Sequence, residues 1–600
     1  MKKPSMLLGL FALVLLISDA SGATYIVSRT APDDNNPGSL RWCMNSANFN
    51  AGAPDTIIFQ IPGTGPFTIF PDSQLPILTD PAGVLIDGLS QTGASAGANP
   101  PSTATLMIVI DGSNAGPAHG IWIVCSNNII QGLVINNFEQ DGIRIQASVD
   151  GTNANFIYCN FVGTDQTGNL AQGNGWNLNL FWAGIYIICT PGYPGVAYSN
   201  QIFNNLVSTN YAEGVGIANC PPGDVAFNIV AYNYIGTDIT GTVDLGNVHD
   251  GVYVGEGAHD NAVDGNLISG NDFEGVCIIG YDELQIYTYS NILFNNIIGL
   301  DINLNPLGNT MDGVSIGQYG NMYQGGFATD NVIDSNTIAR NGANGVTVWE
   351  HSMNTVNADR NWIHQNSIYD NALMGIDLED DLITQNDTND PDAGANQELN
   401  YPVINAAYYY NPSQITIDGT IDIDTDPAQA TVEVFQADPD TFQVGEGRVY
   451  LGFTTPDATG NWNITVSGLV IGDLVTATTT DLNLNTSEFS NIEPVVLGIT
   501  EKSISQQPLT YTLKQNIPNP FSSLTAIHYA LPKTTHVQLS IYDVTGKLIR
   551  TLADGVQNVS YHTAYWNGVD DNGSHVSSGV YFYTLETDDF KTTKKMLFTK

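Results

Sequence analysis

The sequence predicts an all-β protein: a right-handed, single-stranded parallel β-helix followed by two small, immunoglobulin-like β-sandwich domains. Two short phrases alternate over much of the chain before residue 400, one of each per ~30 residues, which is the spacing of a solenoid repeat. No helix-length periodic segment separates them, so an alternating β-α fold is disfavoured. Beyond residue 400 longer strands with alternating apolar residues begin, which is typical of sandwiches.

Each phrase is interpreted as a short strand. In Gly-(Val/Ile)-x-(Ile/Val/Leu) the branched residues point into the core and x points outward. In Asn-x-(Ile/Val/Leu)-x-x-Asn the asparagines flank a bend, because Asn tolerates the left-handed conformation and equivalent amides of stacked coils can bond as a ladder. A β-propeller is the rival, but it needs four strands per repeat. The asparagine pairs are Asn155/Asn160, Asn200/Asn205, Asn228/Asn233, Asn261/Asn266, Asn291/Asn296, Asn331/Asn336 and Asn361/Asn366. The second phrase begins at Gly142, Gly184, Gly214, Gly251, Gly275, Gly313, Gly345 and Gly375.

Three coils carry a similar glycine-rich polar insertion, beginning at Gly163, Gly236 and Gly299. Insertions at one corner of a solenoid map to one face, which is often the binding face. A repeated hairpin inherited by duplication is the alternative interpretation.

The expected domain order starts with a signal peptide over residues 1–23, since Lys2 and Lys3 precede an apolar run that is too short to anchor in a membrane. A cap and first coils follow over 24–120, with a short helix after Pro37 covering the solenoid end. The β-helix proper is expected over 121–400. The remaining segments are a sandwich acting as spacer or sugar-binding unit (401–497), a linker (498–511) and a second sandwich (512–600).

The composition excludes some partners. The formal net charge is −43, and no lysine occurs between Lys3 and Lys502. Such a surface repels nucleic acid and anionic lipid, and no other segment is apolar enough to span a bilayer after signal cleavage. The six cysteines could oxidise in an exported chain, and Cys189 could meet Cys220 across one rung, although buried free thiols fit equally well.

Calcium is the one candidate cofactor. Oxygen donors recur at Asp387, Asn389 and Asp392 before a glycine, which resembles a calcium loop, but the glutamate of an EF-hand is missing. A solvated linker is the alternative interpretation of this segment.

Two stretches resemble known families. Pro37 to Phe59 (Pro-Gly-Ser-Leu-Arg, then Ala-Asn, then Asp-x-Ile-x-Phe) resembles the N-terminal signature of large bacterial surface β-helix proteins, which implies an exported, adhesin-like protein. The end of the chain is similar to the type A sorting domain of the type IX secretion system of Bacteroidota and relatives. This similarity rests on Asn519-Pro-Phe521, Ile541-Tyr-Asp543, Trp566-Asn-Gly568, Ser578-Gly-Val-Tyr-Phe-Tyr583 and Lys594-Lys-Met596. It implies the type IX machinery as a partner, and release from or attachment to the outer surface of a Gram-negative cell.

Candidate ligand-binding residues form two columns of the predicted stack. The residues before the strand glycines, which we call the carboxyl column, include Asp141, Glu213, Asp250, Glu274 and Asp312. Beside them the x positions, which we call the outer column, include Arg144, Tyr186 and Tyr253. Carboxylates next to exposed tyrosines suit a sugar chain lying along the stack, while Asp-Gly and Glu-Gly as plain turn formers are the simpler interpretation. Carboxylates at rung spacing repel, which needs relief by solvent, a cation or a raised pKa.

The sequence leans against catalysis. The ordered motifs of polygalacturonase-like hydrolases are absent, and Arg144 near Asp141 is the sole candidate base of a calcium-dependent lyase. The preferred hypothesis is therefore a surface β-helix that binds glycan or matrix. A polysaccharide lyase or glycoside hydrolase acting on a uronate-containing polymer is the alternative, and a structural surface stalk is the second alternative.

Overall fold

The computed structural model describes residues 22–50, 52–97, 101–176, 182–280, 286–317, 327–350, 358–391, 393–439, 445–498, 510–571 and 573–599. The predicted signal sequence lies outside this range except for its last two residues. Among the described residues, no helix has the length and apolar composition needed to cross a bilayer. The predicted all-β class, a parallel β-helix with two small sandwiches, is confirmed.

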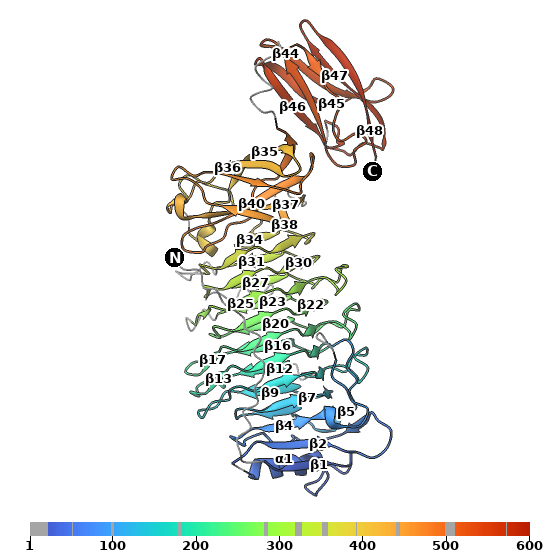
Figure 1. Cartoon of the computed structure of the whole chain (residues 1–600), viewed down its shortest axis with the longest axis vertical. Coiled ribbons are helices and arrows are strands. Elements are labelled where there is room, and N and C mark those ends of the chain that lie inside the picture. The colour runs from blue at the N-terminus through green and yellow to red at the C-terminus, as the bar shows by residue number, and fades with distance from the viewer. Residues whose placement is uncertain are drawn as a thin grey trace.

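Three parallel sheets run the length of the rod in Figure 1. Sheet 1 contains β1 (Thr24–Val27), β2 (Asp55–Phe59), β4 (Val84–Asp87), β7 (Ile129–Gln131), β10 (Phe156–Tyr158), β14 (Gln201–Phe203), β18 (Ile229–Ala231), β21 (Ala262–Asp264), β25 (Ile292–Phe294), β29 (Val332–Asp334) and β32 (Trp362–His364). Sheet 2 contains β3 (Phe67–Ile69), β5 (Ile108–Asp111), β8 (Leu133–Asn136), β11 (Phe161–Val162), β15 (Leu206–Val207), β19 (Tyr234–Ile235), β22 (Leu267–Ile268), β26 (Ile297–Ile298), β30 (Thr337–Ala339) and β33 (Ser367–Tyr369).

Sheet 3 carries the second sequence phrase. It contains β6 (Ile121–Ile123), β9 (Ile143–Gln146), β12 (Ala183–Ile188), β16 (Glu213–Ala218), β20 (Val252–Gly255), β23 (Val276–Ile279), β27 (Val314–Ile316), β31 (Val346–Val348) and β34 (Ile376–Leu378). Two short pairs lie at a corner: β13 (Val196–Tyr198) with β17 (Asp224–Ala226), and β24 (Thr288–Tyr289) with β28 (Ala328–Thr329).

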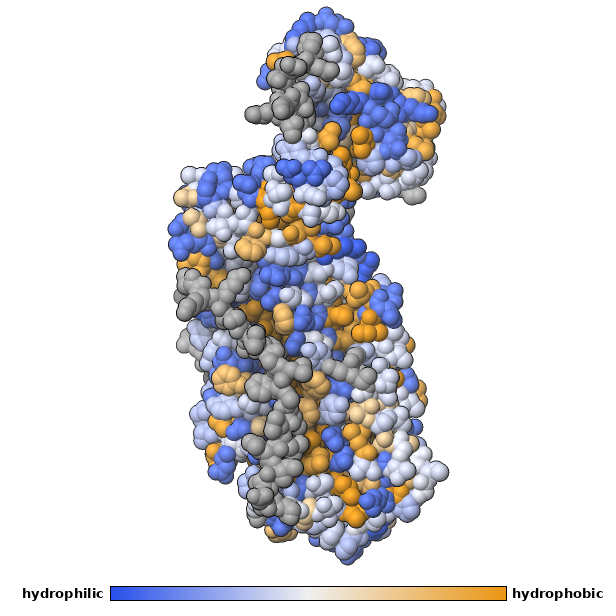
Figure 2. Space-filling model, in the orientation of Figure 1, coloured by the Kyte–Doolittle hydropathy of each residue, from blue (hydrophilic) through white to orange (hydrophobic). Residues whose placement is uncertain are grey.

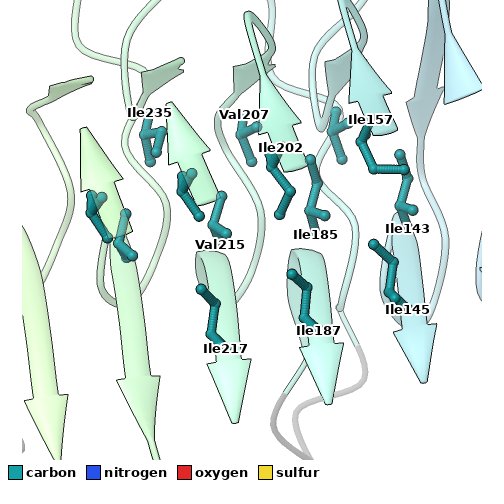
Figure 3. Close-up of a cluster of buried hydrophobic side chains, with 14 of the residues drawn as sticks. Ile143, Ile145, Ile157, Ile185, Ile187, Ile202, Val207, Val215, Ile217 and Ile235 are labelled. Carbon is teal, nitrogen blue, oxygen red and sulfur yellow. The ribbon is translucent and has the colours of Figure 1, made fainter. Parts of the chain in front are cut away.

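The interior is one continuous apolar core. Branched residues of all three sheets meet inside the coils, as Figure 3 shows for Ile145, Ile187 and Ile217 on successive strands of sheet 3. At the N-terminal end α1 (Leu40–Phe49) covers this core with Leu40 and Met44, and the Ser39 side chain caps the helix by accepting from the Trp42 N–H. The short covering helix expected after Pro37 is therefore present.

Three amide ladders define the corners. In each ladder the side-chain oxygen of one asparagine accepts from the side-chain amide of its equivalent in the preceding coil, for example Asn128 Nδ2 to Asn155 Oδ1 at 2.8 Å. The first ladder comprises Asn128, Asn155, Asn200, Asn228, Asn261, Asn291, Asn331 and Asn361. The second comprises Asn160, Asn205, Asn233, Asn266, Asn296, Asn336 and Asn366. The third, which the sequence did not indicate, comprises Asn174, Asn210, Asn247, Asn271, Asn309, Asn341 and Asn371.

One detail of the corner prediction is wrong. The ladder asparagines do not take the left-handed conformation; in the first two ladders the residue before each asparagine does, as at Phe227 (φ 58°) before Asn228 and Asp260 (φ 54°) before Asn261. The tight bend thus precedes the asparagine, whose buried amide bonds to neighbouring coils and to backbone.

The glycine-rich insertions are hairpins that cover sheet 2. Isolated antiparallel bridges join Thr164 to Ala171, Thr237 to Asp244 and Leu300 to Pro306. Apolar residues of the outer face of sheet 2, including Leu206 and Leu267, form a buried cluster against which Ile239 of an insertion packs. The insertions are therefore hairpins, and whether their face binds a ligand stays a prediction.

The first sandwich follows the solenoid directly. Its strands pair in the order β38 (Gly445–Thr454), β37 (Thr431–Pro439), β40 (Leu474–Thr480), β41 (Glu493–Leu497), β35 (Val403–Asn411), β36 (Gln414–Thr420) and β39 (Asn461–Val466). The second sandwich pairs β42 (Thr512–Leu513), β43 (Thr525–Leu531) and β46 (Ser560–Trp566) in one sheet. Its other sheet pairs β45 (Leu548–Gln557), β44 (Thr535–Tyr542), β47 (Gly579–Thr587) and β48 (Lys591–Phe598).

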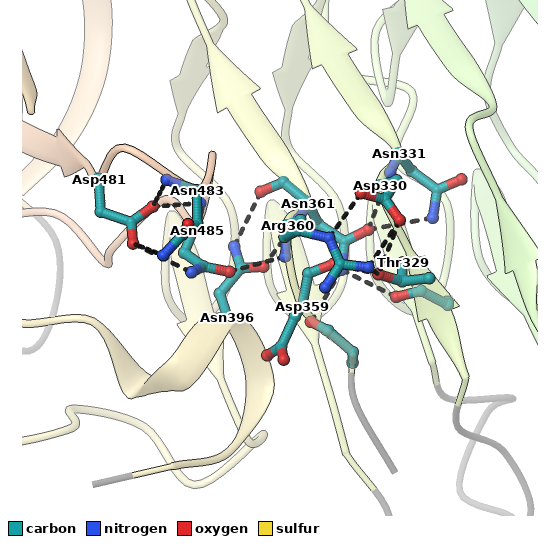
Figure 4. A network of polar contacts seen from close by, with 12 residues as sticks. Thr329, Asp330, Asn331, Asp359, Arg360, Asn361, Asn396, Asp481, Asn483 and Asn485 are labelled. Atoms are coloured by element: carbon teal, nitrogen blue, oxygen red, sulfur yellow. Dashed lines mark hydrogen bonds and ion pairs between the residues drawn. The ribbon is translucent and has the colours of Figure 1, made fainter. Parts of the chain in front are cut away.

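The first sandwich closes the C-terminal end of the solenoid, and its expected role as a spacer or sugar-binding unit stays a prediction. Its Phe435 and Phe489 belong to the solenoid core cluster. Its side chains accept from N–H groups of the last coil: Glu446 from Asn371 at 3.1 Å, Glu433 from Gln365 at 2.9 Å and Thr486 from Ile363 at 3.0 Å. Figure 4 shows the neighbouring network around Asn396, Arg360 and Asn485. A coil edge that would otherwise template further strands is thereby covered.

The described residues on the face seen in Figure 2 mix hydrophilic and hydrophobic side chains along the rod. Exposed aromatic rings include Trp176, Tyr193, Tyr211 and Phe227. Because single exposed apolar residues are ordinary, an exposed ring marks a site only where other observations join it.

Candidate functional site

The carboxyl column exists as the sequence predicted. The register of sheet 3 pairs Ala183 with Glu213 directly. The pairing of Val252 with Val276, and of Val276 with Val314, places Asp250, Glu274 and Asp312 at one level of successive coils. All five carboxyl residues are buried.

Hydrogen bonds show that the carboxyl column has a structural role. The Asp141 Oδ1 accepts from the Ala183 N–H at 2.8 Å, which is the equivalent position of the next coil. Asp250 Oδ1 accepts from the Glu274 N–H at 3.3 Å, and Asp312 Oδ1 accepts from the Asn344 N–H at 2.8 Å. In the following coil Asn344 does the same for the Met374 N–H, also at 2.8 Å. These side chains therefore link successive coils at the start of each strand.

The carboxyl groups of this column are buried in the wall that sheet 3 forms, where little water reaches them. Burial, and then the charge of Glu274, raise the pKa of Asp250 well above its ordinary value. Burial raises the pKa of Asp312 to about 7, against the opposing bonds from Thr347 and Asn344. Asp377, in the outer column near Asp380, also has its pKa raised by burial to about 7. Protonation is thus one relief for the repulsion between rungs.

The outer column occupies the predicted register, because Arg144 pairs with Tyr186 and Tyr253 pairs with Cys277. The expectation that its tyrosines are exposed is wrong for Tyr186, which is 4% exposed. Its ring lies against Gly216 of the next coil, where a Cβ would approach the ring to 2.6 Å. Alternation along a strand fixes the side of a sheet and does not fix what covers it.

A buried polar cluster lies at the N-terminal end of sheet 3. Asp141 Oδ2 contacts Arg144 Nη1 at 2.9 Å and His119 Nδ1 at 3.0 Å. His119 meets Trp122 edge-on, with ring centroids 4.9 Å apart. The sequence left His119 unassigned because 22 positions separate it from Asp141, and only stacking of the coils joins them.

The predicted calcium loop stays a prediction. Asp392 lies outside the described residues. The Asp387 N–H donates to Asn400 Oδ1 at 3.0 Å, and the Asn389 N–H donates to Asp422 Oδ2 at 3.3 Å. In the part of the chain that the structure describes, no group of three or more His, Cys, Asp or Glu side chains could hold a metal ion.

All six cysteines are buried free thiols, so Cys189 and Cys220 do not form the disulfide that the sequence left open. The Cys220 thiol donates to Glu256 Oε2 at 3.0 Å. Burial, and then the charge of Glu256, raise the pKa of the Cys220 thiol, while burial raises that of Cys125 to about 11.

Comparisons with known proteins give partial likenesses. The model of the FlgD Ig-like domain family matches residues 522–589, within the second sandwich. A 3-dehydroshikimate dehydratase of Acinetobacter baylyi (strain ATCC 33305 / BD413 / ADP1) is 28% identical over 272 residues. That alignment covers 44% of this chain and 52% of the relative, so the chain spans about half the length of the curated relative it matches.

Three solved structures show weak overall likeness. The periplasmic alginate epimerase AlgG is 15% identical with a TM-score of 0.29, covering 56% of this chain and 66% of that one. The A-module of the Azotobacter vinelandii mannuronan C-5 epimerase AlgE4 is 12% identical with a TM-score of 0.26, covering 59% and 80%. The enzymatically active domain of tailspike protein 2 of bacteriophage CBA120 is 11% identical with a TM-score of 0.25, covering 91% and 79%. TM-scores this low carry no functional weight.

Proposed function

We propose that this protein is an exported, cell-surface β-helix that binds an extracellular polysaccharide without cleaving it. The observation that carries the proposal is the use of the carboxyl column. Asp141, Asp250 and Asp312 each give one oxygen to an N–H of the next coil. Acid and base catalysis needs carboxyl groups that reach substrate, with one water or a glycosidic oxygen between them. Buried carboxyl groups that bond to the next coil stabilise the solenoid wall and do not reach a substrate.

Export through the type IX system is supported by the ordered motifs in residues 512–600 and by the match of residues 522–589 to an immunoglobulin-like family. The second sandwich has its own core, which includes Trp566, Tyr583 and Phe598, so it can act as a separate recognition unit. Deleting residues 512–600 in the source organism is expected to abolish surface display. Display that persists would contradict this part of the proposal.

An elimination catalyst is the second candidate function. The observation that favours it is the His119–Asp141–Arg144 cluster, and the curated relative is named a dehydratase. In a lyase reaction on a uronate polymer, His119 would take the proton from the carbon beside the carboxylate and Arg144 would face the anion that develops. The glycosidic oxygen would then leave and take up a proton from water as the carbon–carbon double bond forms. A structural stalk remains the third possibility, favoured if no polysaccharide binds.

One experiment separates the three. The secreted chain is incubated with neutral and uronate-containing polysaccharides, with and without calcium, and both retained polymer and new chain ends are measured. Binding without new unsaturated or reducing ends supports the preferred function. New chain ends that disappear in His119→Ala would support the elimination catalyst instead. A protein that neither binds polymer nor produces new ends would support the structural stalk.

A further inference from the structure

A small cavity opens at the corner where chain segments leave sheet 2 and enter sheet 3, near the N-terminal end of the solenoid. Its volume is about 330 Å³, at the lower end of the range of ~300–1,000 Å³ usual for small-molecule sites. It is lined by residues that follow four different strands: Ser113 after β5, Asn137 after β8, Gln172 and Trp176 after β11, and Thr209 and Tyr211 after β15. The stacking of coils therefore assembles the cavity from distant parts of the sequence.

Two aromatic rings flank the cavity and remain open to solvent. The exposed fraction is 50% for Trp176 and 44% for Tyr211. Gly173, in the same segment as Trp176, faces the Tyr211 segment, and a Cβ there would approach the Tyr211 ring to 3.1 Å and the Thr209 carbonyl to 2.0 Å. The missing side chain thus lets the first insertion lie close against Tyr211. Aromatic faces beside polar groups are suited to hold a sugar ring, which has an apolar face and hydroxyl edges.

The polar groups of the cavity are amides and hydroxyls. Gln172 Oε1 accepts from Asn136 Nδ2 at 2.6 Å, and Asn137 Nδ2 donates to Asp111 Oδ2 at 3.0 Å. Among the described residues, Gln172 Nε2 and Asn137 Oδ1 make no hydrogen bond, so one donor and one acceptor are left for a ligand. The bonds that Asn136 and Asp111 do make hold both side chains in place.

Charge selects the class of ligand. Every residue that lines the cavity is uncharged. The chain as a whole carries a formal net charge of −43, with no lysine between Lys3 and Lys502, so a polyuronate approaches against repulsion. A neutral sugar meets no such barrier and can satisfy both the rings and the amides.

The same corner continues along the rod. Trp176 stands two residues after Asn174 of the third amide ladder. The equivalent positions of the next four coils hold Ala212, His249, Phe273 and Met311. The His249 and Phe273 rings stack with centroids 5.0 Å apart and an interplanar angle of 7°. A linear polymer lying along the axis would therefore meet the stacked His249 and Phe273 rings beyond the cavity.

We infer that this corner is the polysaccharide-binding site and that its ligand is a neutral hexopyranose polymer, held by Trp176 and Tyr211 with Gln172 and Asn137. The inference rests on the proposed function and deepens it, because it replaces the buried columns of sheet 3 with a solvent-open site. It also excludes uronate-containing polymers as the preferred ligand.

The test measures binding of the secreted full chain to hydroxyethyl cellulose, glucomannan, soluble starch and polygalacturonate by affinity electrophoresis. Trp176→Ala and Tyr211→Ala are expected to weaken binding of the preferred neutral polymer at least tenfold, while Trp176→Phe keeps most of it. Tyr193→Ala is the matched control, because Tyr193 is 65% exposed and lies outside the cavity. Unchanged melting temperatures show that the variants are folded.

The outcomes are separable. Loss in both alanine variants, with Tyr193→Ala binding normally, supports the site. A neutral polymer that binds all variants equally overturns the site and leaves the proposed function standing. Preference for polygalacturonate overturns the ligand class, and failure of the unaltered protein to retain any polymer overturns both the inference and the proposed function.

Discussion

Replacing Asp312 by asparagine should stabilise the solenoid at alkaline pH. Asp312 is 8% exposed, its Oδ1 accepts from the Asn344 N–H, and burial raises its pKa to about 7. Asn344 already shows that an amide suits this column, since its Oδ1 accepts from the Met374 N–H and its Nδ2 donates to Thr347 Oγ1 at 3.0 Å. The variant keeps the acceptor and removes the charge.

The direction in which stability changes with pH follows from the difference between the unfolded and the folded pKa of Asp312. An unfolded aspartate ionises near pH ~3.9, so between about pH 4 and pH 7 the folded state holds a proton that the unfolded state has lost. Asp312 therefore makes the folded state lose stability as pH rises through this window, and the loss levels off above it. A difference of roughly three pKa units lowers the free energy of unfolding by on the order of 4 kcal/mol. This is an upper figure, because relaxation of the surrounding wall and water penetration reduce the effect.

Urea unfolding at pH 5 and pH 8 measures this effect. Between pH 5 and pH 8 the unaltered protein should lose roughly two pKa units of stability, about 3 kcal/mol as an upper figure. Asp312→Asn should recover part of that loss at pH 8 and gain less, about 1 kcal/mol, at pH 5. Asp150→Asn is the control, because Asp150 is exposed on a turn. If Asp312→Asn lowers stability at pH 8, or leaves the pH difference as large as in the unaltered protein, the description of the carboxyl column as a buried wall is wrong.

Three further predictions concern the ladders, the cap and the thiols. Asn233→Ala removes hydrogen bonds to Asn205 and Asn266 and should lower the free energy of unfolding by ~1–3 kcal/mol or more. The control Asn303→Ala, on a hairpin, should lower it little. Equal losses of the two variants in denaturant titrations would contradict a stabilising role of the ladder. Glu446→Ala should speed amide exchange at the Asn371 N–H and Glu446→Gln should largely preserve it, since the glutamine oxygen can still accept; no change in either would exclude Glu446 as a cap. The native chain should expose almost no thiol to a disulfide reagent and six after denaturation without reductant, and a lower final count would reveal a disulfide.

The sequence predicted the architecture because two phrases place branched residues and corner asparagines at a fixed spacing. It missed the third amide ladder, whose Asn174, Asn247 and Asn309 lie within or beside the insertions and break the spacing. The contacts of Glu446 and Glu433 with the last coil span 75 and 68 positions, and no local pattern marks them.

The sequence predicted the register of the carboxyl and outer columns correctly but not their burial. Sheet alternation placed Asp250, Glu274 and Tyr186 correctly in their columns. Whether a column is open depends on neighbouring coils, as when Tyr186 settles against Gly216, and on side chains reaching the next backbone, as Asp141 does. The corner cavity was missed because Asn137, Trp176 and Tyr211 belong to three coils and share no sequence phrase.

The central claim is that this solenoid holds polysaccharide and leaves its glycosidic bonds intact. The most direct measurement records, in one sample of the purified chain, both the polymer retained and the unsaturated or reducing ends released over time. Retention with a flat record of ends is the predicted result. A steady release of ends that stops in Asp250→Asn, which keeps the coil-to-coil acceptor and removes only the acid, would contradict it.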